Sequence, residues 1–572
     1  MNTRTLLVLL LVFLGMMMYV EWQSQFNTQT PAPVEPLPGA ESVAATRPTN
    51  GEQAVPDLPD MVDSASTAVP QPNEDVAAAL PAAQAIVSGT RIEVRTDRLM
   101  AHINPVGGAL MDLRLLRYPV RVDQPDQPFP LLSENQAEWF VAQAGLVDRA
   151  GLAPNHTDTF EYDREFYQLA PGQERVEVPL TWRGPDGLEV IQTWIFKRDT
   201  YVVEHQLEII NPTSSSWSGS RYLQLQRTPK VFAGGMTFTN PERISYNGAA
   251  VYDPVNKFRK LPFDEFAEEP FQASAEGGWA GMVQHYFLAS WIPQANQLHR
   301  YTTRQVDRVV PNRYALSATS GQITVEPGGR HAFNAELFAG PKQQRRLDDV
   351  APGLSLTVDY GMFTIFSKPL FWLLDQIHSL VKNWGVAIIL LTLLIKLAFY
   401  KLTQAQFRSM GKLRKLQPRI QQLKERYGDD RQKFGQAMMD IYKKEKVNPL
   451  GGCLPILVQI PIFIALYWVL LESVELRQAG FLWVPDLSRP DPYFILPIIN
   501  GAFMIITQRL TPMVGMDPMQ RKVMQYLPVV FAVLFAFFPA GLVLYWAANS
   551  GISLAQQWFI LRQLDAEEAC KN

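Results

Sequence analysis

The apolar run WGVAIILLTLLIKLAFY, residues 384–400, decides the fold of this 572-residue chain. With its flanks it is about long enough to cross the hydrocarbon core of a bilayer as a helix. Its single charge, Lys396, lies about 18 Å along that helix, past the middle of a core about 30 Å thick. A charge at this depth costs roughly 2.5 to 3.5 kcal/mol, so it normally faces a bundle interior or a watery cavity. The alternative is that the long side chain lifts its ammonium to the interface.

Other apolar stretches flank this run, at 6–20, 453–471, 493–508 and 523–561. The last covers 39 residues, roughly 58 Å as a helix, which is far more than one crossing needs. It is therefore predicted to fold back, and Pro539-Ala540-Gly541 is the expected turn. The pattern predicts a polytopic α-helical membrane protein, with an N-terminal anchor and a five-helix core bundle.

The N-terminal stretch resembles a secretory signal behind Arg4, but no small-x-small cleavage site follows it. We expect an uncleaved anchor, with a cleaved signal as the alternative. Residues 27–85 are rich in Pro, Ala, Thr and Asp and cannot bury enough apolar surface to fold. They are predicted to be a flexible tether.

Residues 88–350 contain short alternating runs separated by Gly, Pro and Asn. Every second residue from Tyr201 to Ile209 belongs to a mostly apolar set, and the residues between are more polar. This alternation with a period of two is typical of half-buried strands. This predicts a large all-β sandwich. Its histidines show no HxH or HExxH spacing, so no metal site is expected. The only cysteines are Cys453 and Cys570, so an exported domain must hold together without disulfides.

Charge is distributed unevenly between the loops. Residues 401–446 hold thirteen Lys or Arg against five Asp or Glu, whereas 472–491 hold two basic and four acidic residues. The positive-inside rule places the first segment in the cytoplasm and the second outside. Six crossings then put both termini in the cytoplasm and the β domain on the outer side of the membrane.

Two amphipathic regions border the 384–400 run. Residues 363–381 carry an apolar face at helical spacing, which favours a helix in the outer interface; a core helix of a soluble protein is the alternative. Two helical stretches, about 403–427 and 430–446, are predicted to pair as a basic antiparallel hairpin. This basic surface is open to three interpretations: a solvated positive-inside face, contact with acidic lipid, or contact with ribosomal RNA. The basic side chains singled out on the hairpin are Arg408, Lys412, Arg414, Lys415, Arg419, Lys424 and Arg426.

These patterns divide the chain as follows: 1–22 N-terminal transmembrane anchor, 23–87 flexible linker, 88–353 periplasmic β-sandwich domain, 354–382 interfacial amphipathic helix, 383–402 transmembrane helix 2, 403–450 cytoplasmic basic hairpin, 451–472 transmembrane helix 3, 473–491 periplasmic loop, 492–509 transmembrane helix 4, 510–522 cytoplasmic loop, 523–539 transmembrane helix 5, 541–562 transmembrane helix 6, and 563–572 cytoplasmic tail.

Few polar side chains occur inside the predicted core helices. On the final helix Tyr545, Asn549 and Ser553 lie on one face, and Thr392 lies one turn before Lys396. Hydrogen bonds between helices would explain these residues, as would a hydrated groove.

Several strings resemble the YidC family of membrane protein insertases. They are KVNPLGGCLPILVQIPIFIALYWVL (446–470), SVELRQA (473–479), DLSRPDPYFILPI (486–498), DPMQRKVM (517–524), FPAGLVLYW (538–546) and AQQW (555–558). They follow one another in the expected order between 446 and 558, within a resemblance that covers almost all of 355–562. In the β region, GGWAGMVQHYFLASWIP (277–293) resembles the periplasmic domain of the Gram-negative members.

The resemblance implies a non-enzymatic insertase and chaperone of the inner membrane. It would move short hydrophilic segments of nascent membrane proteins through a cytoplasm-open groove into lipid, alone or with the Sec translocon. The implied groove or substrate contacts are Lys396, Thr392, Gln459, Tyr545, Trp546, Asn549 and Ser553, and Ile460 and Phe463 are implied as an apolar slide. The implied partners are nascent membrane proteins, the Sec translocon, the ribosome and the bilayer. Catalytic residues, metals, cofactors and small-molecule substrates are not expected.

One departure from the family concerns the groove charge, which is often arginine in the family and is Lys396 here. The sign is kept, but the planar fork that holds a carboxylate at two points is lost. The sequence lacks the P-loop pattern GxxxxGK[ST], so nucleotide hydrolysis is not expected to drive insertion.

Two other functions remain open from the residues. One is an ion- or proton-coupled transporter that uses Lys396 as its titrating site. The other is a sugar-binding β domain with a membrane anchor. The bundle shows no inverted repeat and no second buried charge, and five core helices exceed what anchoring requires.

Overall fold

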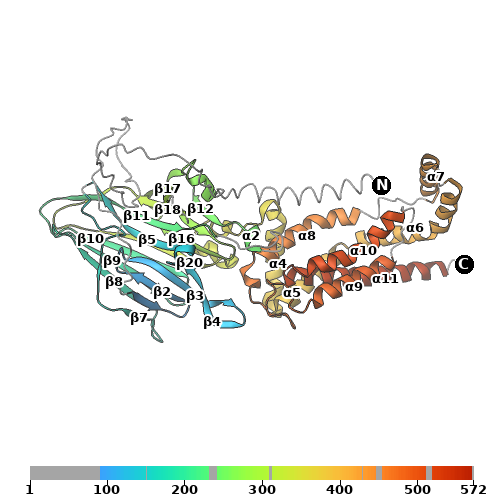
Figure 1. The fold of residues 1–572 in the computed structure, drawn as a ribbon, viewed down its shortest axis with the longest axis horizontal. Helices are drawn as coiled ribbons and strands as arrows, with labels where there is room; N and C mark the ends of the chain where they lie inside the picture. Colours follow the sequence, from blue (N-terminus) through green and yellow to red (C-terminus); the bar gives the residue numbers. More distant parts are fainter. Residues whose placement is uncertain are drawn as a thin grey trace, which may run out of the picture.

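The computed structural model describes residues 91–149, 151–230, 241–307, 312–427, 430–445, 454–510 and 518–569. The predicted anchor, 1–22, and linker, 23–87, lie outside these described residues. Figure 1 shows a β domain at one end of the molecule and a group of helices at the other.

The β domain consists of two large sheets, counted within the described residues. The first has eleven strands: β14 (Gln272–Glu276), β17 (Leu298–Asp307), β18 (Arg313–Ser320), β11 (Trp217–Arg227), β5 (Phe140–Asp148), β3 (Ala109–Arg121), β2 (Leu99–Asn104), β1 (Ile92–Arg95) and β7 (Phe166–Gln168) in order, with β19 (Ile323–Val325) beside β11 and β4 (Gln124–Leu132) beside β3. The second has nine: β13 (Lys257–Leu261), β12 (Gly248–Asp253), β15 (Trp279–Val283), β16 (Phe287–Pro293), β20 (Arg330–Pro341), β10 (Val202–Ile210), β9 (Glu189–Lys197), β8 (Arg175–Arg183) and β6 (Glu161–Tyr162). The expectation of a large all-β domain is confirmed.

The strand phase predicted from the sequence is present in β10. Val203, His205, Leu207 and Ile209 are buried, whereas the residues between them are partly or fully exposed. His205 lies edge-on to Trp194 and Trp291, at 4.6 and 5.6 Å between ring centroids. The histidine thus belongs to an aromatic core.

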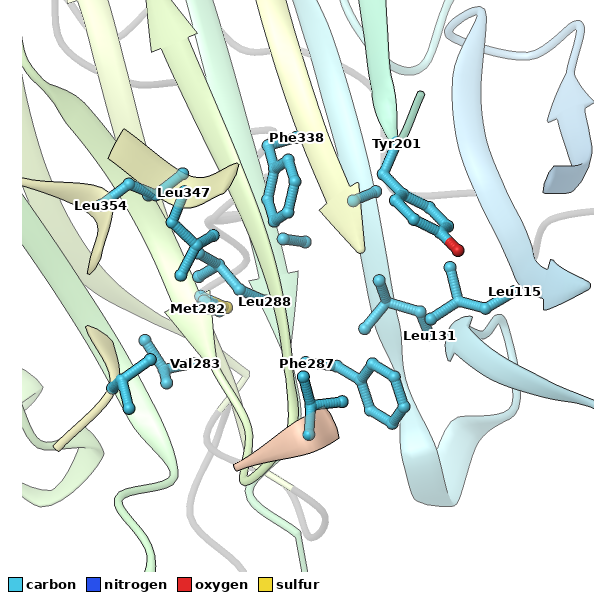
Figure 2. Packing of buried hydrophobic residues seen from close by; sticks show 14 of the residues in the cluster. Leu115, Leu131, Tyr201, Met282, Val283, Phe287, Leu288, Phe338, Leu347 and Leu354 are labelled. Atoms are coloured by element: carbon cyan, nitrogen blue, oxygen red, sulfur yellow. The ribbon is translucent and has the colours of Figure 1, made fainter. Parts of the chain in front are cut away.

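Short elements connect the β domain to the helices. These are α2 (Pro241–Ile244), α3 (Gln344–Val350), η4 (Leu354–Thr357) and η5 (Gly361–Phe363). Figure 2 shows Leu347 and Leu354 beside the sheet residues Met282 and Leu288. This buried apolar cluster continues from the sandwich into the helices as far as Tyr545.

The helical part contains α4 (Thr364–Val381), α5 (Trp384–Ala398), α6 (Tyr400–Tyr427), α7 (Arg431–Lys444), α8 (Leu454–Glu472), α9 (Ile495–Leu510), α10 (Pro518–Phe535) and α11 (Ala540–Ala569). The α6–α7 hairpin lies at the end of the helices farthest from the β domain (Figure 1). The predicted turn near Pro539 lies between α10 and α11.

Among the described residues, no helix taken alone combines the length and hydropathy of a membrane span, whereas Trp384–Ala398 and Tyr400–Lys412 do so as a pair bent by 68°.

Several helix limits differ from the predicted segments. The helix expected over 383–402 ends at Ala398, where Phe399 has φ near −94° and ψ near 12° and caps it by donating its N–H to Ile395 O. Likewise, α10 begins at Pro518, inside the expected 510–522 loop. Proline fits a first helical turn because its missing N–H would have no partner there. The last helix, α11, continues to Ala569, through most of the expected tail.

Candidate substrate groove

Lys396 lies in the last turn of α5. The helix begins after Asn383, whose side-chain oxygen accepts the Val386 N–H at 3.0 Å and so satisfies one of the free amides of the first turn. A cation near the C-terminus is favoured by the helix dipole. Although the 68° bend follows three residues later, the Lys396 side chain does not project outward. It is 6% exposed.

A chain of polar contacts joins Lys396 to two other helices. The Lys396 Nζ donates to Gln459 Oε1 on α8 at 3.5 Å, and Gln459 Nε2 donates to Asn549 Oδ1 on α11 at 2.7 Å. The first contact is long for a hydrogen bond and the second is short. Within the described residues, no carboxylate forms an ion pair with Lys396. The ammonium is therefore buried with an amide oxygen as its hydrogen-bond acceptor.

Two predicted groove residues bond to their own helices. The Thr392 hydroxyl, on a side chain 1% exposed, donates to Ile388 O at 2.7 Å, and the Ser553 hydroxyl donates to Asn549 O at 2.7 Å. Such bonds to the carbonyl four residues earlier satisfy a buried hydroxyl locally. Thr392 lies on the buried side of α5 together with Lys396, one turn earlier.

Aromatic side chains pack beside this polar chain. Tyr545 is 2% exposed, and its ring lies nearly parallel to that of Phe463, 6.2 Å away. Phe463 also meets Trp546 at 4.7 Å, near the edge-to-face geometry that aromatic pairs favour. Of the two expected slide residues, Phe463 is thus partly covered by α11, whereas Ile460 is 44% exposed.

One polar contact between helices was not predicted as part of a site. The Ser550 hydroxyl donates to Asn500 Oδ1 at 2.9 Å, which connects α11 to α9, and Asn500 is fully buried. The sequence signal was present, because an amide inside an apolar helix usually has a partner on a neighbouring helix. The sequence alone did not identify the partner of Asn500, since Asn549 and Ser550 are adjacent polar residues on the last helix and either could have contacted it.

The hairpin presents its basic side chains to solvent. Arg408, Lys412, Arg419 and Arg426 are exposed, and Arg419 pairs with Glu445 at 2.7 Å. The hairpin core consists of Leu416 and Ile420, packed against residues of α7. Arg414, Lys415 and Lys424 were also predicted here, but their side chains lie outside the described residues.

Comparison with known proteins defines the class of this chain. A family model described as 60Kd inner membrane protein matches residues 376–567, and a second, YidC periplasmic domain, matches residues 91–373. The two matches define an inner membrane protein with a periplasmic domain.

Relatives with assigned functions agree with this class. The membrane protein insertase YidC of Nitrosococcus oceani is 44% identical over 568 residues, 99% of each chain, and that of Stutzerimonas stutzeri is 41% identical over 574 residues, 98% of each. A crystal structure of an active YidC insertase, with its first transmembrane domain resolved, is 21% identical, covers 82% of this chain and 92% of that one, and gives a TM-score of 0.39.

The chain belongs to the YidC family of membrane protein insertases. It is an insertase that acts on nascent membrane proteins, and the family is not a family of enzymes. These relatives do not support the alternative of an ion- or proton-coupled transporter.

Proposed function

We propose that Lys396, Gln459 and Asn549 are the polar lining of the groove through which short hydrophilic segments pass. The observation that supports this most is the environment of Lys396. Lys396 is 6% exposed, and among the described residues its ammonium donates a hydrogen bond to a neutral amide at 3.5 Å. A charge taken out of water without a counter-charge is costly. A carboxylate on a passing client segment would lower that cost.

The route needs no nucleotide. A hydrated cavity within the inner leaflet shortens the apolar distance that a polar segment must cross. The membrane potential contributes about 2.3 kcal/mol per charge for each 100 mV, in the direction that moves acidic residues outward. Burial of the client's own apolar helix then completes the insertion.

The exposed Ile460 and the partly buried Phe463 support an apolar slide on α8 beside the polar lining. An emerging client helix would leave the groove along this surface. Tyr545 and Trp546 pack against the ring of Phe463. In the proposal both residues hold Phe463 in place, and Trp546 also borders the slide.

For the topology we propose six membrane helices, with the predicted segment limits and both termini in the cytoplasm. In this arrangement α5 and the bent start of α6 form one crossing, and α4 lies in the outer interface. The large exposed side chains of α4 fit such a position, because Ile365, Trp372 and Leu380 are 77%, 62% and 83% exposed.

The proposed cytoplasmic partners meet the α6–α7 hairpin. Its exposed Arg408, Lys412 and Arg426 suit the phosphates of ribosomal RNA or of acidic lipid. We propose that the protein inserts some clients alone and others together with the Sec translocon.

The test uses liposomes that contain only the purified full-length chain. A short two-helix client with an acidic loop is added, and its insertion is measured by protease protection. Protection should require the protein and should fall with Lys396→Glu. If wild type and Lys396→Glu protect the client equally, the role of the groove charge is wrong; if neither protects it, independent insertion is wrong.

A further inference from the structure

The last turn of α8 is held by a buried ion pair from the β domain. Lys342 follows β20, and its Nζ lies 3.2 Å from Glu472 Oε2 at the C-terminus of α8. Both side chains are 1% exposed. The Lys342 ammonium also donates to Thr357 O at 3.2 Å, and the Ser245 hydroxyl donates to the other oxygen of Glu472. Each charge is therefore compensated inside the junction.

A histidine from the same domain caps the same helix end. His285, 4% exposed, lies between β15 and β16, and its Nε2 is 2.8 Å from Leu471 O. Burial, and then the nearby charge of Lys342, lowers the pKa of His285 to about 3. The ring is neutral at physiological pH, so the Nε2–H donates to a carbonyl that has no partner within the helix. The β domain thus binds both the charge and the free backbone of this helix end.

The anchored helix also carries Gln459. Gln459 and Glu472 are separated by thirteen residues, about 20 Å along a helix, and face different sides. Side chains of the β domain therefore act on Gln459 only through the helix itself. A shift of about 1 Å or a small rotation of α8 would break the 2.7 Å contact of Gln459 with Asn549 and the longer one with Lys396.

We propose that Lys342 and His285 are positioning residues of the insertase: they fix the height and rotation of α8, so that Gln459 meets Lys396 and Asn549. Lys342 and His285 with their partners Glu472 and Leu471 O are here called the α8 clamp. This role rests on the groove proposed above. It gives the β domain a part in insertion that needs no ligand of its own.

The first test compares insertion by full-length variants in liposomes. Lys342→Met leaves Glu472 buried without its counter-charge, and insertion should fall about three- to thirtyfold. The pair Lys342→Met with Glu472→Met replaces both charges by apolar side chains and should insert within about twofold of wild type. The matched control is Lys260→Met, which removes an exposed pair with Asp359 in the same domain and should leave insertion unchanged.

Folding is followed by protease resistance of the β domain and by elution as a single species in detergent. A folded Lys342→Met that inserts like wild type overturns the clamp. If that variant does not fold, His285→Leu decides, because it removes only the hydrogen bond to Leu471 O. A folded His285→Leu that inserts less than wild type supports the clamp, and one that inserts like wild type overturns it.

A second test asks whether the effect passes through Gln459. Gln459→Leu alone should reduce insertion, and adding Lys342→Met should reduce it by less than a further twofold, because both changes disturb the same contact. Multiplication of the two separate effects would show that Lys342 acts elsewhere and would overturn the clamp. An unchanged rate for Gln459→Leu would overturn the groove, and the clamp with it, whereas a silent Lys342→Met would overturn the clamp alone.

Discussion

Lys396 donates to the side-chain oxygen of Gln459 across 3.5 Å, in a bundle whose described residues offer it no carboxylate. The sign of the charge therefore matters more than its exact geometry. We expect Lys396→Arg to retain insertion and Lys396→Glu to reduce it about tenfold or more for clients with acidic loops, because the new carboxylate would repel those of the client. The measurement is rescue of a depleted strain together with protease protection.

A client with a neutral loop provides the control for this prediction. Its insertion should be affected far less by Lys396→Glu. Equal loss for acidic and neutral loops would indicate damage to the bundle and not a role for the charge.

Removing the Ser550 hydroxyl should destabilise the bundle. The fully buried Asn500 loses its donor in Ser550→Ala, and we expect a loss of about 1 kcal/mol in the free energy of unfolding. Replacing both residues with apolar ones, Asn500→Leu with Ser550→Ala, should recover most of the loss. The melting temperature in detergent measures the effect.

Ser553→Ala is the matched control on the same helix. In the described structure the Ser553 hydroxyl donates to the Asn549 carbonyl of the same helix, so its loss breaks no contact between helices. Its melting temperature should stay close to wild type. A larger drop for Ser553→Ala than for Ser550→Ala would contradict the assignment of the contact between α9 and α11.

The carboxyl of Glu475 should make the stability of the junction depend on pH. Burial raises its pKa from 4.5 to about 7 while one oxygen accepts the Gln344 N–H at 3.1 Å. Since the folded state then holds its proton more tightly than the unfolded state, this contribution is present below about pH 4.5 and is lost as the pH rises through 7, by up to about 3 kcal/mol. Glu475→Gln should therefore gain melting temperature relative to wild type between pH 5 and pH 8.

The difference between the two proteins is the quantity to measure, because the depressed pKa of His285 acts in the opposite direction below about pH 6.5. The exposed Glu138→Gln should show no such difference. A constant offset between wild type and Glu475→Gln across this range would contradict the buried-carboxyl explanation.

The hairpin should depend on its small core and not on its exposed ion pair. Ile420 is 2% exposed among apolar neighbours, so Ile420→Asp places an unpaired charge there and should separate α6 from α7. Faster proteolysis within 400–445 would report the separation. Arg419→Ala removes only the exposed pair with Glu445, which contributes at most about 1 kcal/mol, so its cleavage rate should match wild type. Equal cleavage of both variants would contradict this account.

The sequence predicted what depends on local pattern. The inward phase of β10 follows from its alternation, and the burial of Lys396 follows from the length of the apolar run around it. The limit of α5 at Ala398 was not predicted, because the apolar composition continues to Tyr400 while the backbone turns at Phe399.

Contacts between distant segments were the part that sequence reasoning missed. Lys342 and Glu472 are 130 residues apart, and neither stands out, since one follows a strand and the other ends an apolar helix. Their pairing depends on how the sandwich docks onto α8, which periodicity does not describe. Similarly, the face of α11 that carries Asn549 was predicted, but Ser550 was not singled out, and it contacts α9 while Asn549 contacts α8.

The apolar cluster that runs from Ile92 in the sandwich to Tyr545 in α11 makes the two parts of the molecule cooperative. Unfolding of either part would expose buried apolar side chains of this shared cluster to water, which is unfavourable. On heating, the protein should accordingly unfold in one transition, in which the circular dichroism of the strands and that of the helices are lost together.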